Sequence, residues 1–470
     1  MRQQIDPAHI NALSEIAGPR AIIDGDDKAP YLEEWRGRWH GEAPLVLAPS
    51  STDELSKIMA YCHEHDIAVV PQGGNTGLVG GQVPTGEILI TLKRMRRVRE
   101  VSPRDFTMTL DAGVALAEAQ DEAEKAGCLF PLSIGSEGTC QIGGILSTNA
   151  GGVNVIRYGN ARDLVLGLEV VLPDGRMWNG LNRLRKNNTG YDLKHLFVGG
   201  EGTLGFITAA VLKLYPRPAD QVTALLALPS TEAAVDLLSL AQNRSGGQIT
   251  SFELMNRGIY ELVLKHFPDL QRPVETDAPY YALLEFSSGR RDELAPMVEE
   301  LLAEAFEDEI VVDGTIAAGG TQSEALWALR HNASEAMKND PYYCVKCDIS
   351  VPIHKVPTFI DRANAAMEKD TPGARIMAFG HMGDGNIHYD ILGPDGADKA
   401  SWKEHATTLE HAVHDIVADL GGSISAEHGI GVLKRDEMAD RKSDVEMSMM
   451  RAVKNALDPK GLMNPGKVLQ

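Results

Sequence analysis

Basic charge is scarce in this sequence. Its 45 Lys and Arg residues stand against 66 Asp and Glu residues, which gives a formal net charge of −21. Nucleic acids and anionic lipid surfaces attract proteins through a basic face, so this balance argues against both as partners. It is compatible with a basic protein partner. Net charge carries no information about the fold, which has to come from the residue pattern.

Cysteine and long apolar runs are scarce as well. The chain has five cysteines, at Cys62, Cys128, Cys140, Cys344 and Cys347. This odd, sparse set implies no disulfide framework and favours a reducing compartment. The sequence has no apolar run of the ~18 residues that a membrane span requires, and its first residues carry no secretory-signal pattern. We therefore expect no integral membrane segment and a cytoplasmic location, or the mitochondrial matrix in a eukaryote, although no transit peptide is visible.

The length predicts more than one domain, because 470 residues exceed the roughly 100–200 of a typical domain. From Leu45 onward, short β-branched runs alternate with amphipathic stretches that begin with capping residues, such as STDELSKIMAYCHEH. A break falls at residues 215–221, where Pro216 and Pro218 interrupt regular structure, and a second alternating stretch follows it. We therefore expect an α+β protein of two or three domains.

Glycine is dense in the first half of the chain. Gly200, Gly202 and Gly205 form a GxGxxG string, but the β-rich segment FITAAVLKLYP follows where a dinucleotide-binding fold would start a helix. The sequence therefore argues against a Rossmann nucleotide site. Two other loops, at residues 71–81 and 131–152, offer closely spaced backbone N–H groups. Such loops can hold a pyrophosphate without a lysine, or they can simply be tight turns.

The second half of the chain contains histidines and a glutamate within glycine-rich segments. His381 and His388 flank the turn sequence GDG, so a hairpin would return one beside the other. Glu427 and His428 follow in SISAEHGIG. Two histidines and a carboxylate form the ligand set of many open zinc sites, although single histidines near turns more often make ordinary hydrogen bonds. We expect His414, by contrast, on an exposed helix face.

These motifs follow one another as PQGGNTG, SIGSEGT, QIGG, STNAGG, KNNTGYDLKHLFVGGEGTLGFIT, GHMGDGNIH, SAEHGIG and NPGK. In this order they resemble the FAD-linked oxidase/dehydrogenase family with a vanillyl-alcohol-oxidase-type flavin fold. Within that family the resemblance is greatest to D-2-hydroxyacid dehydrogenases, above all those acting on D-2-hydroxyglutarate. It implies a FAD-binding domain of two α+β subdomains over residues 1–218 and a substrate-binding cap over 219–420. A C-terminal segment, 421–470, would return to the flavin site.

The resemblance implies that FAD lies with its pyrophosphate over the 71–81 loop. Relatives that attach the flavin covalently place a histidine in this loop, whereas Asn75 stands there in this chain. We therefore expect non-covalent, dissociable FAD. The contacts that the resemblance implies, carried over match by match, are Pro71, Gly73, Gly74, Asn75, Thr76, Gly77, Ser136, Thr139, Gly143, Gly144, Ser147, Asn149, Gly151, Gly152, Gly205, Ile207 and Asn464.

The resemblance also assigns roles in the second half. It makes His381, His388 and Glu427 the ligands of a divalent metal, with Zn²⁺ preferred, although Mn²⁺, Fe²⁺ or Co²⁺ accept the same ligand types. It makes His428 the base that takes the substrate's hydroxyl proton while a hydride moves to the flavin.

The substrate's own charge would be met by two cations. By resemblance, Arg330 and Lys346 each hold one substrate carboxylate. Two neighbouring substrate positions depart from the family pattern. Ser334 stands where Thr is usual, which keeps the hydroxyl, and Asp390 stands where a neutral Asn is common. We expect the extra negative charge of Asp390 to weaken the binding of a dianion.

The expected enzyme is a FAD- and metal-dependent dehydrogenase that oxidises a D-2-hydroxyacid, first of all D-2-hydroxyglutarate to 2-oxoglutarate. D-lactate, D-malate or glycolate is the alternative substrate within the family. A metal-dependent hydrolase, with the glycines as mere turns, and a non-catalytic flavin-binding sensor are the alternatives outside it. We expect electrons to pass to an electron-transfer flavoprotein or a quinone, since no nicotinamide motif is visible. We also allow for a homodimer, because homodimers are common.

Overall fold

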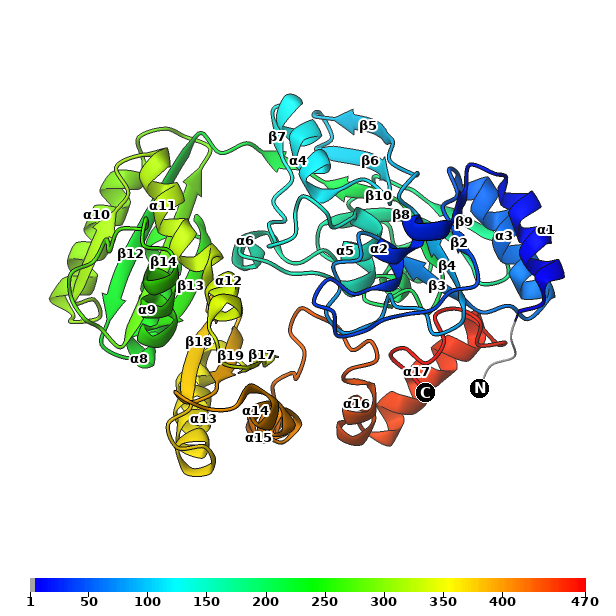
Figure 1. The fold of residues 1–470 in the computed structure, drawn as a ribbon. Coiled ribbons are helices and arrows are strands. Elements are labelled where there is room, and N and C mark those ends of the chain that lie inside the picture. Colours follow the sequence, from blue (N-terminus) through cyan, green and yellow to red (C-terminus); the bar gives the residue numbers. More distant parts are fainter. Residues whose placement is uncertain (1–4) are drawn as a thin grey trace. The chain divides into compact units, whose positions relative to one another are not determined.

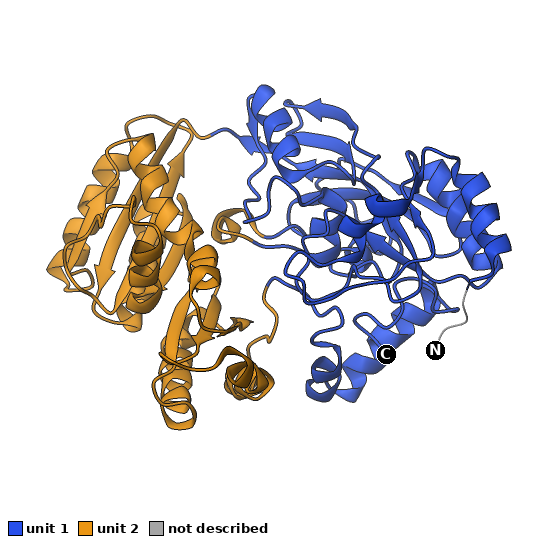
Figure 2. Ribbon diagram, in the orientation of Figure 1, with its two compact units in different colours: residues 1–151, 160–217, 427–470 blue, residues 152–159, 218–426 orange. Residues whose placement is uncertain are grey.

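The computed structural model describes residues 5–470, which form two compact units (Figure 1, Figure 2). Unit 1 contains the chain up to Gly151 together with residues 160–217 and 427–470. Unit 2 contains residues 152–159 and 218–426. The change of unit after residue 217 lies beside the bound expected at 218. The short excursion at 152–159 is not expected from the sequence, and residues 427–470 of the C-terminal segment belong to unit 1.

In unit 1, short apolar runs form a first sheet with the strand order β1-β2-β4-β3. Its strands are β1 (Ile22–Ile23), β2 (Val46–Leu47), β3 (Val69–Gln72) and β4 (Ile88–Thr91). Strand β4 is parallel to β2 and β3. Helix α3 (Thr52–Glu64) connects β2 to β3, and the Ser51 hydroxyl caps it by accepting a hydrogen bond from the Glu54 N–H. This confirms the capped helix predicted from the sequence.

A second sheet in unit 1 has the order β5-β6-β10-β8-β9, with antiparallel pairing throughout. Its strands are β5 (Val98–Ser102), β6 (Thr107–Asp111), β8 (Val165–Val171), β9 (Met177–Gly180) and β10 (Phe206–Lys213). Because β10 follows the GxGxxG string directly, a strand rather than a helix begins there. The strand expected after this string is therefore present, in place of the helix that a dinucleotide-binding motif would open.

The remaining elements of unit 1 are short helices and a small ribbon. They are α1 (Pro7–Ala17), η1 (Gly25–Lys28), α2 (Ala29–Leu32), α4 (Leu116–Lys125), β7 (Cys128–Leu129), α5 (Ile142–Thr148), α7 (Lys194–Phe197), β11 (Tyr215–Pro216), α16 (Arg435–Arg441) and α17 (Asp444–Leu457). Strand β7 pairs with β11, and α5 packs on β10. Within residues 5–470, no helix has both the length and the apolar composition of a transmembrane helix.

The C-terminal segment is bound to loops of unit 1 by partly buried polar contacts. The Asn464 side-chain amide donates to the carbonyl oxygens of Gly81 and Glu201, at 3.0 and 2.9 Å. The Glu201 carboxylate in turn accepts from the N–H groups of Ile430 and Gly431, each at 2.8 Å. Burial raises the pKa of Glu201, and these two N–H groups oppose the rise. The segment is thus an integral part of unit 1.

Unit 2 is built on one antiparallel sheet with the order β15-β12-β14-β13-β18-β19-β16, and β17 also pairs with β19. Its strands are β12 (Asp220–Leu228), β13 (Ile249–Asn256), β14 (Tyr280–Ser288), β15 (Asp313–Ile316), β16 (Cys344–Val345), β17 (Asp348–Ser350), β18 (Arg375–His381) and β19 (Asn386–Leu392). Helix α6 (Val155–Tyr158), from the excursion at 152–159, packs on β13.

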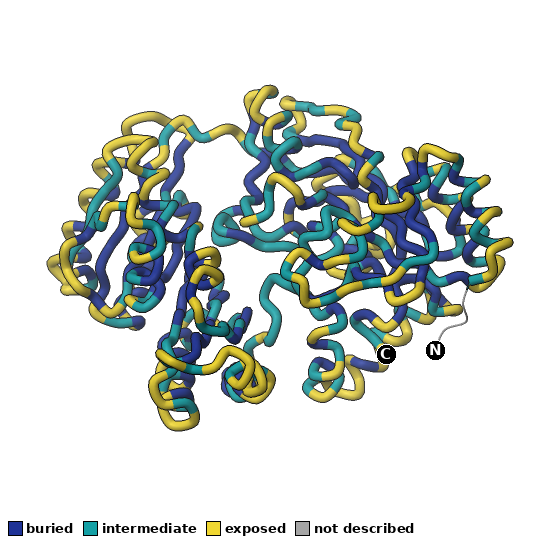
Figure 3. The backbone as a smooth tube through the Cα atoms, viewed as in Figure 1, coloured by how far each residue is buried: buried dark blue, intermediate teal, exposed yellow. Residues whose placement is uncertain are grey.

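Helices cover both faces of this sheet. They are α8 (Thr231–Ser245), α9 (Arg257–His266), α10 (Leu294–Glu307), α11 (Gly320–His331), α12 (Ala333–Asn339), η2 (Ile353–Lys355), α13 (Val356–Asp370), α14 (Lys399–Glu404) and α15 (Ala406–Asp419). Alternate residues of β12 enter two cores: Ala224 and Leu226 pack with α8, α10, α13 and α15, whereas Leu225 and Ala227 pack with α9, α11 and α12. The strands accordingly form the buried interior of the unit (Figure 3).

Candidate active site

The two histidines of the GHMGDGNIH motif lie on one β-hairpin of unit 2. Strand β18 ends at His381, and the chain returns through Gly385 into β19, where His388 pairs with Phe379. Gly385 is required in this turn because its φ is +81° and a Cβ there would lie 2.2 Å from the Val351 carbonyl oxygen. The imidazole ring centroids of His381 and His388 are 5.8 Å apart. The predicted hairpin is confirmed.

A buried glutamate on the neighbouring strand orients His381. Glu253, on β13, is fully buried and accepts a hydrogen bond from His381 Nδ1 at 2.6 Å and one from Arg330 Nε at 2.7 Å. Burial alone would raise the pKa of Glu253, but the charges of His381 and Arg330 outweigh it and lower the pKa to about 2. Because Glu253 accepts the hydrogen bond from Nδ1–H, the neutral form of His381 carries its lone pair on Nε2, the arrangement typical of a metal-binding histidine.

Sequence reasoning missed Glu253. The available signal was a glutamate within the largely apolar segment ITSFELMN, which is typical of a buried strand. A buried carboxylate without a partner is costly, so this glutamate indicated a cationic or hydrogen-bonding partner.

Two further carboxylates line the same strands. Asp348, on β17, pairs with His388 and has Oδ1 3.8 Å from its Nδ1. The Asp348 carboxylate also accepts from the side-chain amide of Asn386 at 3.0 Å. Asp390, on β19, accepts from the Cys347 N–H at 3.2 Å and lies 4.0 Å from Lys346 Nζ. Both acids are buried, so this part of unit 2 concentrates negative charge.

Glu427 and His428 follow the chain's exit from unit 2 at Ala426, whose N–H donates to the Asp348 carbonyl oxygen at 3.4 Å. The ligand atoms of His381, His388 and Glu427 all lie within 4.8 Å of one another, and so do those of Asp348, Glu427 and His428. Nitrogen and carboxylate oxygen donors at this separation suit one divalent ion such as Zn²⁺. The three predicted ligands are thus brought together.

The predicted substrate cations occupy different surroundings. Arg330, near the end of α11, is buried, and its guanidinium stands 4.9 Å from the Phe379 ring centroid, beneath the hairpin. Lys346 lies between β16 and β17, half-buried beside Asp390. Ser334, on α12, is exposed. Arg330 and Lys346 therefore each have a buried carboxylate as neighbour, whereas the hydroxyl of Ser334 faces solvent.

The two predicted flavin loops lie side by side in unit 1. A Cβ on Gly74 would lie 2.0 Å from the Thr139 carbonyl oxygen, and one on Gly73 would lie 3.5 Å from Gly144 Cα. The backbone of the 71–81 loop can therefore approach the 136–144 segment only through glycine. A Cβ at Gly144 itself would meet nothing within 4 Å, so its backbone is open to a ligand. This pairing of glycine-rich backbone fits a diphosphate group.

Several predicted FAD contacts also have structural tasks in unit 1. Asn75 has φ +56°, and its side-chain amide donates to the carbonyl oxygens of Pro30 and Glu33. Asn149 ends α5 in a left-handed conformation and accepts from the Arg162 N–H at 2.9 Å. These hydrogen bonds fix the loop conformations. A contact between FAD and either side chain would therefore use the atoms that are not engaged in these bonds.

The other predicted contacts fall into a few places. Pro71 lies in β3, and Thr76 and Gly77 lie in the loop after it. Ser136 and Thr139 precede α5, which contains Gly143 and Ser147. Gly205 immediately precedes β10, Ile207 is the second residue of β10, and Asn464 lies in the C-terminal segment. Gly151 is the last residue of its segment in unit 1, whereas Gly152 begins the excursion in unit 2. All but Gly152 therefore belong to unit 1.

Comparison with solved structures defines the class of fold. The chain matches 4-ethylphenol oxidase from Gulosibacter chungangensis with a TM-score of 0.75 at 18% identity, covering 100% of this chain and 98% of that one. It matches p-cresol methylhydroxylase with a TM-score of 0.71 at 15% identity, covering 99% and 97%. The fold is the vanillyl-alcohol-oxidase-type flavoprotein fold, with α+β units, as expected.

Family models and curated relatives then fix the family. Residues 43–180 match the FAD binding domain, and residues 217–468 match the C-terminal domain of FAD linked oxidases. D-2-hydroxyglutarate dehydrogenase of Stutzerimonas stutzeri is 36% identical over 98% of this chain and 99% of that protein. The mitochondrial D-2-hydroxyglutarate dehydrogenase of Bos taurus is 36% identical over 97% and 82%. The chain belongs to the FAD-linked oxidase family and is a flavin-dependent oxidoreductase that binds FAD.

Proposed function

We propose that this enzyme oxidises a D-2-hydroxyacid, in the first place D-2-hydroxyglutarate to 2-oxoglutarate, by hydride transfer to non-covalent FAD with the help of a divalent metal. The observation that carries the proposal is the convergence of His381, His388 and Glu427 within 4.8 Å. It is supported by the names of relatives 36% identical over nearly the whole chain. The match to FAD-binding domains disfavours the hydrolase alternative, which has no use for a flavin.

The histidine pair and Glu427 would hold the metal, and Glu253 would keep His381 in the ligating tautomer. Bound there, a divalent metal lowers the pKa of a coordinated hydroxyl, and FAD accepts the hydride. His428, next in sequence to Glu427, would take the hydroxyl proton, because imidazole titrates near neutral pH. The chain's own contribution is thus to orient the alcohol and to remove its proton.

Arg330 would bind a substrate carboxylate with the nitrogens that Glu253 does not use. Its Nε is engaged by Glu253, so the two terminal nitrogens are the donors that remain for a planar acid. Lys346 would serve a second anionic group, although Asp390 already stands 4.0 Å from it.

Asp390 favours a second candidate substrate. A buried carboxylate beside Lys346 offsets the charge that a second substrate carboxylate would need. The monoanions D-lactate and glycolate require only one cation, Arg330. We therefore keep D-lactate or glycolate oxidation as the second candidate, with D-malate between the two because it carries both carboxylates on a shorter chain.

An anaerobic titration of the FAD-loaded protein with D- and L-2-hydroxyacids tests the proposal. D-2-hydroxyglutarate should bleach the flavin absorption, the L-acid should not, and a chelator should abolish the bleaching until a divalent metal is restored. Bleaching only by D-lactate would select the second candidate. Absence of bleaching by every D-acid, with the colour intact, would favour the flavin-binding sensor and refute the dehydrogenase.

The electron acceptor and location are part of the same proposal. We infer an electron-transfer flavoprotein or a quinone as acceptor, because the GxGxxG string precedes a strand and offers no nicotinamide site. Several eukaryotic relatives have "mitochondrial" in their names, which supports a matrix location for a eukaryotic chain and the cytoplasm otherwise. A homodimer stays a prediction, which sedimentation of the purified protein would check.

A further inference from the structure

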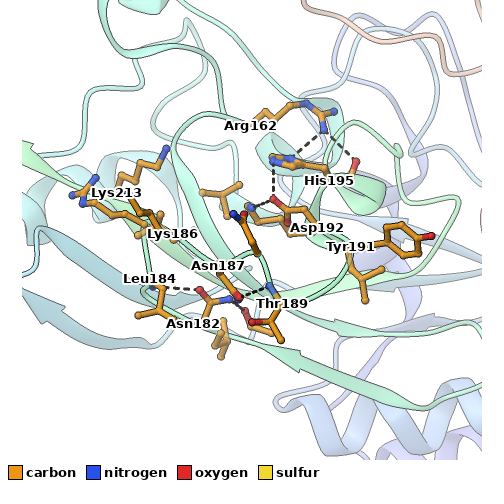
Figure 4. Close-up of a pocket in the computed structure, with 18 of the residues that line it drawn as sticks. Arg162, Asn182, Leu184, Lys186, Asn187, Thr189, Tyr191, Asp192, His195 and Lys213 are labelled. Atoms are coloured by element: carbon orange, nitrogen blue, oxygen red, sulfur yellow. Dashed lines mark hydrogen bonds and ion pairs between the residues drawn. The ribbon is translucent and has the colours of Figure 1, made fainter.

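Unit 1 contains a cleft of about 1000 Å³ that none of the flavin or substrate residues lines. Its walls are the loop from Leu181 to Leu193, the ends of β8, β9 and β10, and helix α7 (Figure 4). This volume is at the upper end of the range for small-molecule sites. The cleft is therefore large enough for a ligand with several charged groups.

The charge of the cleft is opposite to that of the whole protein. Five cations and two acids line it, in a chain with a net charge of −21. The cations are Arg162, Arg185, Lys186, Lys194 and Lys213. The acids are Asp163 and Asp192. A local excess of positive charge on so acidic a protein concentrates anions at this place.

Only part of this positive charge is neutralised by the protein. Lys194 forms an ion pair with Asp192, and Arg162 donates to the carbonyl oxygens of His195 and Val198. Lys213 donates to a backbone carbonyl, that of Asp163. Over residues 5–470, no carboxylate forms an ion pair with Arg185, Lys186 or Lys213. These three cations are the natural anchors for an anion.

Burial and neighbouring positive charge both act on Lys213. Burial lowers the pKa of Lys213, and the positive charges of Arg185 and Lys194 lower it further, against the opposing charge of Asp163. The protonated form of Lys213 is therefore held at a cost that a bound anion would relieve. Figure 4 shows Lys186 and Lys213 on one side of the cleft, with Tyr191 on the other.

The neutral side chains of the cleft also favour an anion. The side-chain oxygens of Asn179, Asn182 and Asn187 each accept a backbone N–H of their own loop. The amide nitrogen of Asn182 also donates to the Gly180 carbonyl oxygen at 3.4 Å. The NH₂ groups of Asn179 and Asn187 are the donors that these side chains offer to a ligand. Donors, rather than acceptors, are what phosphate and carboxylate oxygens require.

We propose that this cleft is a binding site for a small polyanion that carries phosphate or carboxylate groups, separate from the flavin and substrate sites. The anion would bind to Arg185, Lys186 and Lys213, with the loop amides as further donors.

Calorimetric titration of the FAD-loaded protein with pyrophosphate, and separately with citrate, tests this site. We expect one anion per chain, an affinity that falls as salt is raised, and an unchanged flavin spectrum. Preference for pyrophosphate or for citrate tells which anionic group the cleft selects. The double variant Arg185→Glu/Lys186→Glu should weaken binding at least tenfold.

A matched double variant provides the control. Arg20→Glu/Arg104→Glu makes the same change in charge at two exposed positions outside the cleft and should leave the affinity within about twofold. Circular dichroism and flavin content check that both double variants are folded. If neither anion binds, or if both double variants weaken binding equally, the cleft is not an anion site and the proposal is wrong.

Discussion

Glu253 shows how much of the site depends on a single side chain outside the predicted ligand set. It holds both His381 and Arg330 while fully buried. Glu253→Gln should lower metal content and the rate of flavin reduction by D-2-hydroxyglutarate by about 10–100-fold, the usual effect of losing a carboxylate behind a metal-binding histidine. Elemental analysis and anaerobic stopped-flow measure the two quantities.

Glu285→Gln is the matched control for this prediction. Glu285 is also a mostly buried glutamate of the same sheet, but it accepts from Trp327 and Thr223, and burial raises its pKa. A neutral amide is therefore a fair replacement there, and metal content should stay normal. Equal losses in the two variants would mean that Glu253 acts only through the stability of the sheet.

Asp390 is expected to set substrate charge preference. Asp390→Asn removes the negative charge 4.0 Å from Lys346 while keeping an oxygen for the Cys347 N–H. We expect kcat/KM for D-2-hydroxyglutarate to rise about tenfold relative to that for D-lactate, which corresponds to about 1.4 kcal/mol. Steady-state kinetics with both acids measure the ratio, and the exposed Asp361→Asn should leave it unchanged. A ratio unaffected by Asp390→Asn would remove Asp390 from the substrate site.

Individual residues also mark where sequence reasoning fails. His414 is fully buried in α15, although an exposed helix face was expected. Its place on the buried stripe follows from neighbours such as Val413 and Val417, whose core partners come from other elements. Side-chain type alone favoured exposure, and tertiary packing overrode it.

Among the elements, the hairpin was predictable and its sheet was not. Two glycines around Asp384 between apolar runs are a local turn signal, and β18 and β19 follow from it. The pairing of β13 with β18, which brings Glu253 opposite His381, joins residues 128 positions apart. No local pattern encodes such a pairing, because it results from the register of the whole sheet.

Strand β18 is linked to the C-terminal end of α12 by a partly buried ion pair that makes the stability of unit 2 depend on pH. Asp340, at the end of α12, accepts from Arg375 at 2.8 and 3.2 Å. Burial would raise the pKa of Asp340, but the bonds from Arg375 and from the Tyr342 N–H outweigh it and lower the pKa. The stabilisation is therefore complete above the unfolded pKa of about 3.9 and is lost as pH falls through the lower folded value.

Asp340→Asn should consequently reduce the free energy of unfolding by about 1–3 kcal/mol at pH 7, and the difference from the wild type should shrink below pH 4. Urea denaturation followed by circular dichroism, at pH 7 and at a pH below 4, measures the free energy of unfolding of both proteins. Asp395→Asn is the control, because Asp395 lies 3.8 Å from the same arginine but is 85% exposed, and it should have little effect. A pH-independent loss in Asp340→Asn would show that its charge is not what ties the two elements together.

For the molecule as a whole, the division into units was partly visible in the sequence. The double proline near residue 217 marks one change of unit. The excursion at 152–159 has no such signal, because its eight residues join unit 2 through contacts made elsewhere, such as that of Arg157 with the Ser287 carbonyl oxygen at 2.6 Å. Short segments with mainly distant partners are what local patterns cannot assign.

The distribution of predicted FAD contacts leads to a prediction about the two units. All except Gly152 belong to unit 1, and Asn75 stands where the family resemblance implies a histidine in relatives with covalent flavin. Denaturing the protein should therefore release all of the colour into the supernatant.

Because a ligand stabilises only the state that binds it, removing FAD should speed hydrogen exchange in residues 71–81 and 136–151. Strands β12 and β14, in the middle of the unit 2 sheet, should keep their protection. Hydrogen exchange is measured by mass spectrometry with and without FAD. An equal increase of exchange in both units would mean that unit 2 holds FAD as well. Colour left on the denatured polypeptide would mean that the flavin is covalently attached.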